Sequence, residues 1–128
     1  MLNVVAAILK NNDNNILIAK RQQGKSMAGF WEFPGGKIEQ GETLEEALIR
    51  ELKEEMDIDI AINNYFGENI HSYDTINIKL IAFQGSIVKG DIKLSVHDDC
   101  RWVSIEELKN FNFAPADIYF VEKLMEIK

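Results

Sequence analysis

The sequence is short of several features, and each shortage excludes a class of protein. It contains one cysteine, Cys100, so an internal disulfide is impossible, and we expect this residue to pack as a small hydrophobic side chain. The N-terminal apolar run, residues 4–9, is too short to span a membrane and lacks the basic start of a signal peptide. No repeat or low-complexity tract is present. We therefore expect one soluble, cytoplasmic domain over residues 1–128, large enough to bury a core.

Positive charge is also scarce. The chain has 14 lysines and arginines against 21 acidic residues, which gives a net charge of −7. This balance argues against a protein that grips the phosphate backbone of nucleic acid. An anionic nucleotide substrate would need metal ions to mediate its contact with such a chain. Arg21, Lys25 and Lys37 are candidates to neutralise the rest of a triphosphate, although the alternative for each is an ordinary surface role.

The most informative segment is residues 36–58, GKIEQGETLEEALIRELKEEMDI. Thr43 and Glu46 form the capping-box pattern T-x-x-E ahead of an apolar-periodic run, which predicts a helix over residues 44–56. Before this helix, the sequence Pro34-Gly35-Gly36 predicts a bend where the backbone can approach a ligand closely.

Acidic residues of the predicted helix fall on its apolar side. At about 100° per residue from Leu44, Glu51 and Glu55 lie near −20° and +20°, within the apolar stripe, and Glu54 lies at its edge near −80°. Arg50 projects to the opposite face. A solvated acidic face is the usual alternative, but it would place the glutamates away from the apolar residues. Inward carboxylates are costly unless paired or bound to metal, and oxygen ligands suit Mg²⁺ or Mn²⁺.

The spacing of this segment resembles the signature of the Nudix hydrolases, G-x5-E-x7-R-E-U-x-E-E-x-G-U, where U is aliphatic. The chain resembles the MutT side of that family. The last glycine is replaced by Asp57, a residue that tolerates the left-handed conformation expected at this helix end. Every other fixed position of the signature is filled: Gly36, Glu42, Arg50, Glu51, Leu52, Glu54, Glu55 and Ile58.

The resemblance implies a fold and a reaction. The fold is of the α+β class, an α/β/α sandwich with a mixed β-sheet between helices. The reaction is attack of water on a phosphorus of a nucleoside diphosphate linked to another group. In MutT-like members the attack falls on the β-phosphorus and gives a monophosphate and pyrophosphate. The implied partner is a small nucleotide rather than a nucleic acid polymer or a membrane, and the chain is expected to be a monomer or a homodimer.

The resemblance also assigns roles to residues. The divalent ions are expected at Glu51, Glu54 and Glu55, joined by the backbone carbonyl of Gly35. Arg50 is expected to orient the acidic cluster and Glu42 to support it. Residues expected to bind the substrate are Arg21, Gly36, Lys37 and Asp117.

A second position departs from the family. Relatives commonly carry a further glutamate six residues before a tryptophan that resembles Trp102, and here that position is Val96. Either the site lacks this carboxylate, or His97 or Asp98 takes its place. A shift of one residue along a strand turns a side chain to the other face. This shift argues against either replacement, and the alternative for His97 is an ordinary surface histidine.

Base recognition is expected near the C-terminus. Residues 113–118, Phe-Ala-Pro-Ala-Asp-Ile, resemble the base-recognising segment of MutT and of bacterial CTP pyrophosphohydrolases. An ionised Asp117 accepts hydrogen bonds only, and both cytosine and guanine offer donors, so the preferred base stays open. The alternative is that Asp117 caps the last helix.

The other patterns predict the scaffold. We expect strands at residues 2–9, 16–21, 58–62, 66–73, 76–83 and 99–103, and helices at 104–109 and 118–127. Two other classes stay open: a catalytically silent Nudix-fold module that binds nucleotides or proteins, and an acidic structural or calcium-binding protein. The full acidic set argues against the first, and the lack of EF-hand spacing argues against the second.

Overall fold

The computed structural model describes residues 1–126. Its elements follow in the order β1 (Leu2–Leu9), β2 (Ile16–Arg21), β3 (Trp31–Glu32), β4 (Gly35–Lys37), α1 (Leu44–Met56), β5 (Asp59–Tyr73), β6 (Ile76–Lys89), β7 (His97–Val103), the 3-10 helix η1 (Glu106–Asn110) and α2 (Pro115–Glu126).

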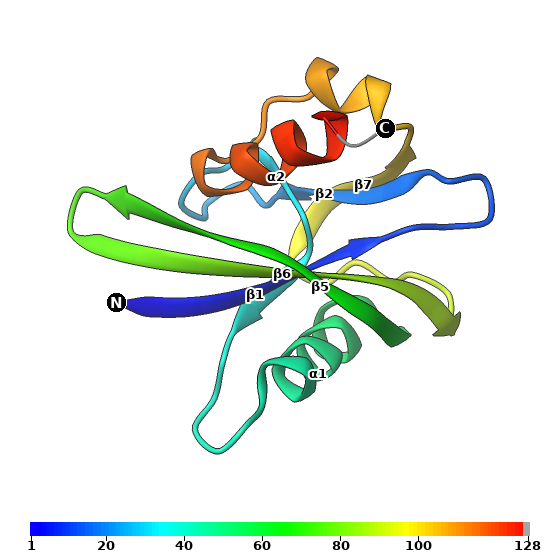
Figure 1. The fold of residues 1–128 in the computed structure, drawn as a ribbon, viewed down its shortest axis with the longest axis horizontal. Helices are drawn as coiled ribbons and strands as arrows, with labels where there is room; N and C mark the ends of the chain where they lie inside the picture. Colours follow the sequence, from blue (N-terminus) through cyan, green and yellow to red (C-terminus); the bar gives the residue numbers. More distant parts are fainter. Residues whose placement is uncertain (127–128) are drawn as a thin grey trace.

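Two sheets lie between the helices. The four-stranded sheet has the order β4-β1-β6-β5, in which β1 and β6 are parallel and the other pairs antiparallel. The three-stranded sheet, β3-β2-β7, is antiparallel. Figure 1 shows α1 on one side of these strands and α2 on the other. The expected α/β/α sandwich with mixed strand pairing is confirmed.

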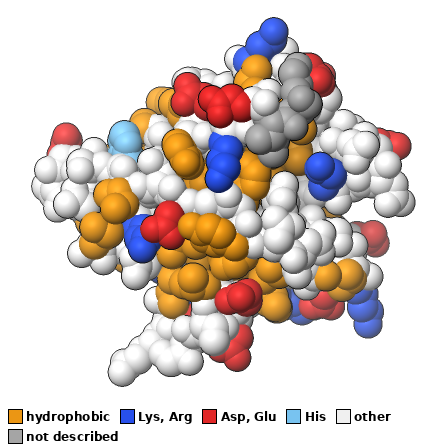
Figure 2. Space-filling view, in the orientation of Figure 1, with side chains coloured by type: hydrophobic (Ala, Val, Ile, Leu, Met, Phe, Trp, Pro, Cys, Tyr) orange, Lys and Arg blue, Asp and Glu red, His pale blue; other side chains and the backbone are white. Residues whose placement is uncertain are grey.

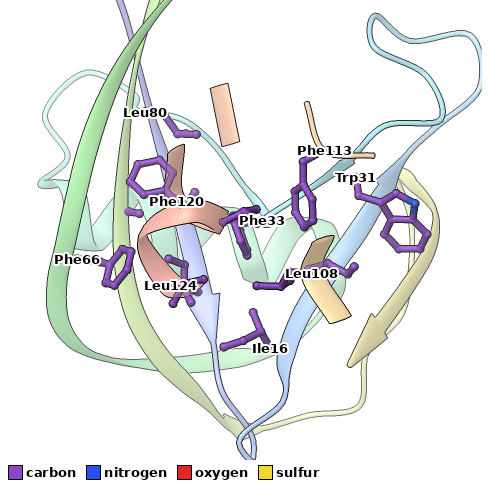
Figure 3. Packing of buried hydrophobic residues seen from close by; sticks show 14 of the residues in the cluster. Ile16, Trp31, Phe33, Phe66, Leu80, Leu108, Phe113, Phe120 and Leu124 are labelled. Carbon is purple, nitrogen blue, oxygen red and sulfur yellow. The ribbon is translucent and has the colours of Figure 1, made fainter. Parts of the chain in front are cut away.

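The alternation of side chains along β1 explains why both faces are covered. Ala6 and Ile8 join the core cluster under α2, whereas Val5, Ala7 and Leu9 join the cluster under α1. Successive side chains of a strand point to opposite faces, so an uninterrupted apolar strand needs a layer on each side. Figure 3 shows the α2-side cluster, in which aromatic side chains converge from strands, loops and helix.

The capping box and the left-handed end of α1 are both present. Thr43 Oγ1 accepts from the Glu46 N–H at 3.1 Å, and Glu46 Oε1 accepts from the Thr43 N–H at 2.9 Å. Asp57 has φ 57° and ψ 38°, and its N–H donates to the Lys53 carbonyl. Its carboxylate lies 3.2 Å from Lys53 Nζ. Asp57 therefore ends the helix in the conformation that glycine would adopt, with an ion pair to the last turn.

Six predicted elements differ in extent, and one of them is the strand predicted at 76–83, which continues as β6 to Lys89. β5 is one continuous strand, although two strands were expected at 58–62 and 66–73, and its pairing with β6 contains register shifts. β7 begins at His97, and α2 begins at Pro115, a residue suited to the first turn of a helix. The segment after Ser104 forms a 3-10 rather than an α-helix. The predicted last helix ends at residue 127, which lies outside the described residues.

The described surface is mixed in character. Among residues 1–126, no helix has both the length and the apolarity needed to cross a bilayer. In the face drawn in Figure 2, lysine and arginine side chains stand singly among acidic and hydrophobic ones. That face therefore offers no continuous basic stripe from its described residues.

Candidate active site

Helix α1 turns two of its three key carboxylates toward the protein. The Glu51 side chain is 14 % exposed and Glu55 is half-buried, as the helical projection predicted. The Glu54 side chain is 57 % exposed, so this residue, predicted at the edge of the apolar stripe, faces solvent. The three glutamates thus border the helix surface rather than share one buried pocket.

Arg50 gathers the acidic residues around one guanidinium group. Its Nε donates to Glu42 Oε2 at 2.6 Å, and its Nη1 donates to Glu51 Oε1 and Glu54 Oε1 at 2.8 Å each. Its Nη2 donates to the Lys37 carbonyl at 3.0 Å. The side chain therefore folds back from the opposite face to which the projection assigned it. These bonds raise the Arg50 pKa further above its usual value and lower the pKa of Glu42.

Glu55 carries an unpaired buried atom. Glu55 Oε1 has no hydrogen-bond partner within the described chain. Burial raises the Glu55 pKa to about 8, and a hydrogen bond and negative charge from Glu51 add to the shift, as does the charge of Glu32. Near neutral pH, Glu55 therefore holds a proton until a positive charge comes to it.

The two glycines before α1 allow close approach to these carboxylates. A Cβ atom on Gly36 would overlap the Glu51 carboxylate, and one on Gly35 would overlap the Val5 carbonyl. Both glycines pair with β1, which fixes them beside the helix. Only a residue without a side chain fits between β1 and the Glu51 head group.

The donor set fits a hard divalent cation. Glu51 Oε2 beside Gly36 and the unpaired Glu55 Oε1 are carboxylate oxygens, the ligand type that Mg²⁺ and Mn²⁺ prefer. Across residues 1–126, no three acidic, histidine or cysteine side chains are already gathered around one point. Arg50 occupies one oxygen each of Glu51 and Glu54, which accounts for the open arrangement.

A second polar cluster lies on β3 and was not predicted. Glu32 Oε1 accepts from Arg21 Nη1 at 2.8 Å, and Glu32 Oε2 lies 2.9 Å from His97 Nε2. Arg21 Nε donates to the Ser26 carbonyl at 2.8 Å. The charge between Trp31 and Phe33 in an apolar stretch was the one local signal that Glu32 has a role.

The alternative of a surface position for His97 is wrong, because the residue is only 7 % exposed. The reason is a bulge: Lys20 pairs with Asp99 but Arg21 pairs with His97, so Asp98 is skipped. An extra residue in one strand turns the preceding side chains to the other face. Asp98 itself is exposed and accepts from the Gln23 N–H at 3.1 Å, and Val96 is exposed. Asp98 is therefore directed at the 22–29 loop instead of helix α1.

Asp117 is buried and does not cap α2. It is the third residue of a helix that starts at Pro115, and its Oδ2 accepts from the Phe33 N–H at 3.0 Å. The capping alternative is therefore wrong. Burial, helped by the charge of Glu32, raises the Asp117 pKa to about 8. Near neutral pH a protonated carboxyl both donates and accepts, which corrects the expectation of an acceptor only.

Strand β5 fixes the start of α2 next to Asp117. Asn69 Nδ2 donates to the Ala116 carbonyl at 3.1 Å, and the Tyr73 hydroxyl accepts from the Ala116 N–H at 3.2 Å. These partners are more than forty positions away in the chain, so no local pattern predicted them. Lys25 and Lys37 are exposed, which leaves their substrate contacts a prediction.

Comparisons with known proteins match most of the chain. Residues 5–123 match the family model described as the NUDIX domain. The chain is 36% identical to the CTP pyrophosphohydrolase of Escherichia coli K12, over 100% of this chain and 94% of the relative. It is 32% identical to the 8-oxo-dGTP diphosphatase of the same strain, over 98% of each chain.

A solved structure is similar as well. The crystal structure of the MutT protein from Methanosarcina mazei Go1 superposes with a TM-score of 0.87 at 30% identity, covering 98% of this chain and 93% of that one. The agreement extends over both sheets and both helices, because the match leaves almost none of the chain outside it.

Proposed function

The chain belongs to the Nudix hydrolase family, and on that premise we propose that it hydrolyses nucleoside triphosphates to the monophosphate and pyrophosphate. Hydrolases of this family need divalent cations, and we propose Mg²⁺ or Mn²⁺ here. The observation that carries the proposal is the acidic cluster on α1, ordered by Arg50 and ending in the unpaired Glu55 Oε1.

Each residue of the cluster has a task in this proposal. Glu51, Glu54 and Glu55 would hold the cation together with the Gly35 carbonyl. A bound divalent cation polarises phosphoryl oxygens, lowers the pKa of water and stabilises charge on the leaving pyrophosphate. Arg50 holds one oxygen each of Glu51 and Glu54, which limits how far these two carboxylates move when the cation and substrate bind.

The supporting residues act on the arrangement of this cluster. Glu42 holds Arg50 through two hydrogen bonds. The absence of a side chain at Gly36 lets the triphosphate approach the Glu51 carboxylate. We assign Lys37 and Arg21 to the substrate, as cations that complement its charge.

We assign Asp117 to the base. As a neutral carboxyl it can donate to one base atom and accept from another, while Phe33 holds its Oδ2. Similar relatives are named for CTP and for 8-oxo-dGTP. Cytosine and guanine each present a donor and an acceptor on one edge, so this group suits either.

Pyrophosphate release from a nucleotide panel tests the proposal. The panel contains dCTP, 5-substituted dCTP, dGTP and 8-oxo-dGTP, each assayed with Mg²⁺, with Mn²⁺ and with EDTA. We expect pyrophosphate from at least one nucleotide with either cation and none in EDTA. Turnover that persists in EDTA would refute the metal site. Binding without turnover under every condition would identify a silent nucleotide-binding module instead.

We also propose the setting in which the enzyme works. Residues 1–128 form one domain, present as a monomer or homodimer, that acts on free nucleotides rather than on nucleic acid. Its compartment is the cytoplasm, where nucleoside triphosphates are available. The negative net charge supports free nucleotides, because metal ions can mediate their contact whereas a polymer needs a basic surface.

A further inference from the structure

A chain of polar contacts connects β7 to the loop at residues 22–29. It runs from His97 Nε2 to Glu32 at 2.9 Å, from Glu32 to Arg21 Nη1 at 2.8 Å, and from Arg21 Nε to the Ser26 carbonyl at 2.8 Å. Its members come from three strands of one sheet and from the loop. The first link is the most buried, because the His97 side chain is 3 % exposed and that of Glu32 is 18 % exposed.

The contact with Glu32 indicates which nitrogen of the His97 ring carries a proton. A carboxylate accepts hydrogen bonds, so Nε2 carries the proton and donates to Glu32. The other ring nitrogen, Nδ1, is buried and has no partner within residues 1–126. His97 thus offers one directed donor, aimed at Glu32.

Glu32 in turn restrains a cation. The Arg21 side chain is 31 % exposed, and an arginine at such a surface normally samples many rotamers. Here Nε and Nη1 are both held, one by the loop and one by Glu32, and no protein atom of the described residues takes Nη2. A guanidinium held at two nitrogens presents the third in one direction, so less entropy is lost when a ligand binds there.

The restrained arginine lies beside the residue assigned to the base. Phe33, the neighbour of Glu32 on the chain, donates its N–H to Asp117. The charge of Arg21 also reaches Asp117 and lowers its pKa against the larger effect of burial. The 22–29 loop, Arg21 and Asp117 therefore border the same part of the candidate site.

We propose that Glu32 and His97 are positioning residues for nucleotide binding: they hold Arg21, and through the Ser26 carbonyl the 22–29 loop, in the geometry that receives the nucleotide. His97 acts through Nε2 alone. This inference rests on the proposed function for its kinetic consequences, but the restraint on the loop is a property of the free protein.

Three variants of His97 separate this role from direct catalysis or metal binding. His97→Gln keeps an amide donor at the Nε2 position and removes Nδ1. His97→Leu fills the space without any donor, and His97→Asn leaves a polar side chain too short to reach Glu32. Asp99→Asn, on the same strand but paired with Arg101, is the matched control. If the leucine variant does not fold, the asparagine variant gives the same comparison.

The first readout is hydrogen exchange of the 22–29 amides in the metal-free, nucleotide-free protein. We expect faster exchange in His97→Leu and His97→Asn, and wild-type exchange in His97→Gln and Asp99→Asn. Unchanged exchange in the leucine and asparagine variants would overturn the proposal. This measurement needs no turnover, so it stands even if the wild-type protein releases no pyrophosphate and the proposed function fails.

The second readout is the split between KM and kcat, with Mg²⁺ affinity measured by calorimetry. Loss of one charge-assisted contact predicts a KM about tenfold higher in His97→Leu, with kcat within about threefold and Mg²⁺ affinity unchanged. His97→Gln should restore KM. A glutamine variant as impaired as the leucine variant, or a loss confined to kcat or Mg²⁺ binding, would show that Nδ1 has a direct role and would overturn the positioning assignment.

Discussion

Replacing Glu55 with glutamine should stabilise the metal-free protein and abolish its activity. The folded-state pKa of Glu55 is raised from 4.5 to about 8. Between these values the folded chain keeps a proton that the unfolded chain has released. Stability therefore falls as pH rises through this window. Glutamine never ionises and keeps the shape, so its variant should lack this part of the pH dependence.

The magnitude follows from the width of the window. Each pH unit between the two pKa values is worth about 1.4 kcal/mol, and partial exposure of the side chain reduces the total to roughly 2–4 kcal/mol. We compare the unfolding free energy of Glu55→Gln with that of the wild type in EDTA. The advantage of the variant should be larger at pH 8 than at pH 5 by that amount. Asp117 shares the direction of shift, so some slope remains in both proteins.

Urea denaturation at pH 5, 6.5 and 8 measures this difference. Glu46→Gln is the control, since Glu46 is exposed and glutamine keeps its capping bond to the Thr43 N–H. Added Mg²⁺ should reverse the order, stabilising the wild type and leaving Glu55→Gln nearly unchanged. If the unfolding free energies of wild type and Glu55→Gln in EDTA change with pH in the same way, Glu55 is not a buried carboxyl that stays protonated.

Two further predictions concern residues with contrasting burial. Glu54→Gln should lower kcat by about a hundredfold by removing charge from the proposed metal site. It should change stability by less than about 0.5 kcal/mol, because the residue is exposed. Equal effects of Glu54→Gln and Glu46→Gln on kcat would contradict this assignment. Asp117→Asn should keep the hydrogen bond to the Phe33 N–H. The order of kcat/KM across the nucleotide panel should then be the same from pH 7 to pH 9 in this variant, whereas in the wild type it should change as Asp117 ionises. Asp117→Ala should reorder the ranking and cost about 1–3 kcal/mol of stability, because the Phe33 N–H loses its partner. An unchanged ranking in both Asp117 variants would move base recognition to other residues.

The helix could be predicted from sequence because its determinants are local. The capping box at Thr43, the left-handed Asp57 and the inward placement of Glu51 and Glu55 depend on neighbours within about one turn. The exposure of Glu54 was less predictable, since a residue at the edge of a stripe is decided by what packs beside the helix. Here Arg50 draws the Glu54 carboxylate along the surface.

The position of His97 depended on a register that no local pattern reveals. The bulge that skips Asp98 exists only because β7 pairs with β2 in this alignment. Glu32 became part of the candidate site because partners at Arg21 and His97 reach it across the sheet. The raised pKa of Asp117 likewise depends on burial, which the tertiary fold alone determines.

The short segment from Glu32 to Gly36 sets the spacing between the two halves of the candidate site. Consecutive residues contact different elements: Glu32 holds Arg21, the Phe33 N–H binds Asp117, and the Pro34 carbonyl accepts from the Ala7 N–H at 2.8 Å. Gly36 then lies against Glu51. An extended chain spans about 3.3 Å per residue and cannot stretch further when it is anchored at each step. The distance between the residues proposed to bind the base and those proposed to bind the metal is therefore set by backbone length, and inserting one residue here would misplace both groups at once.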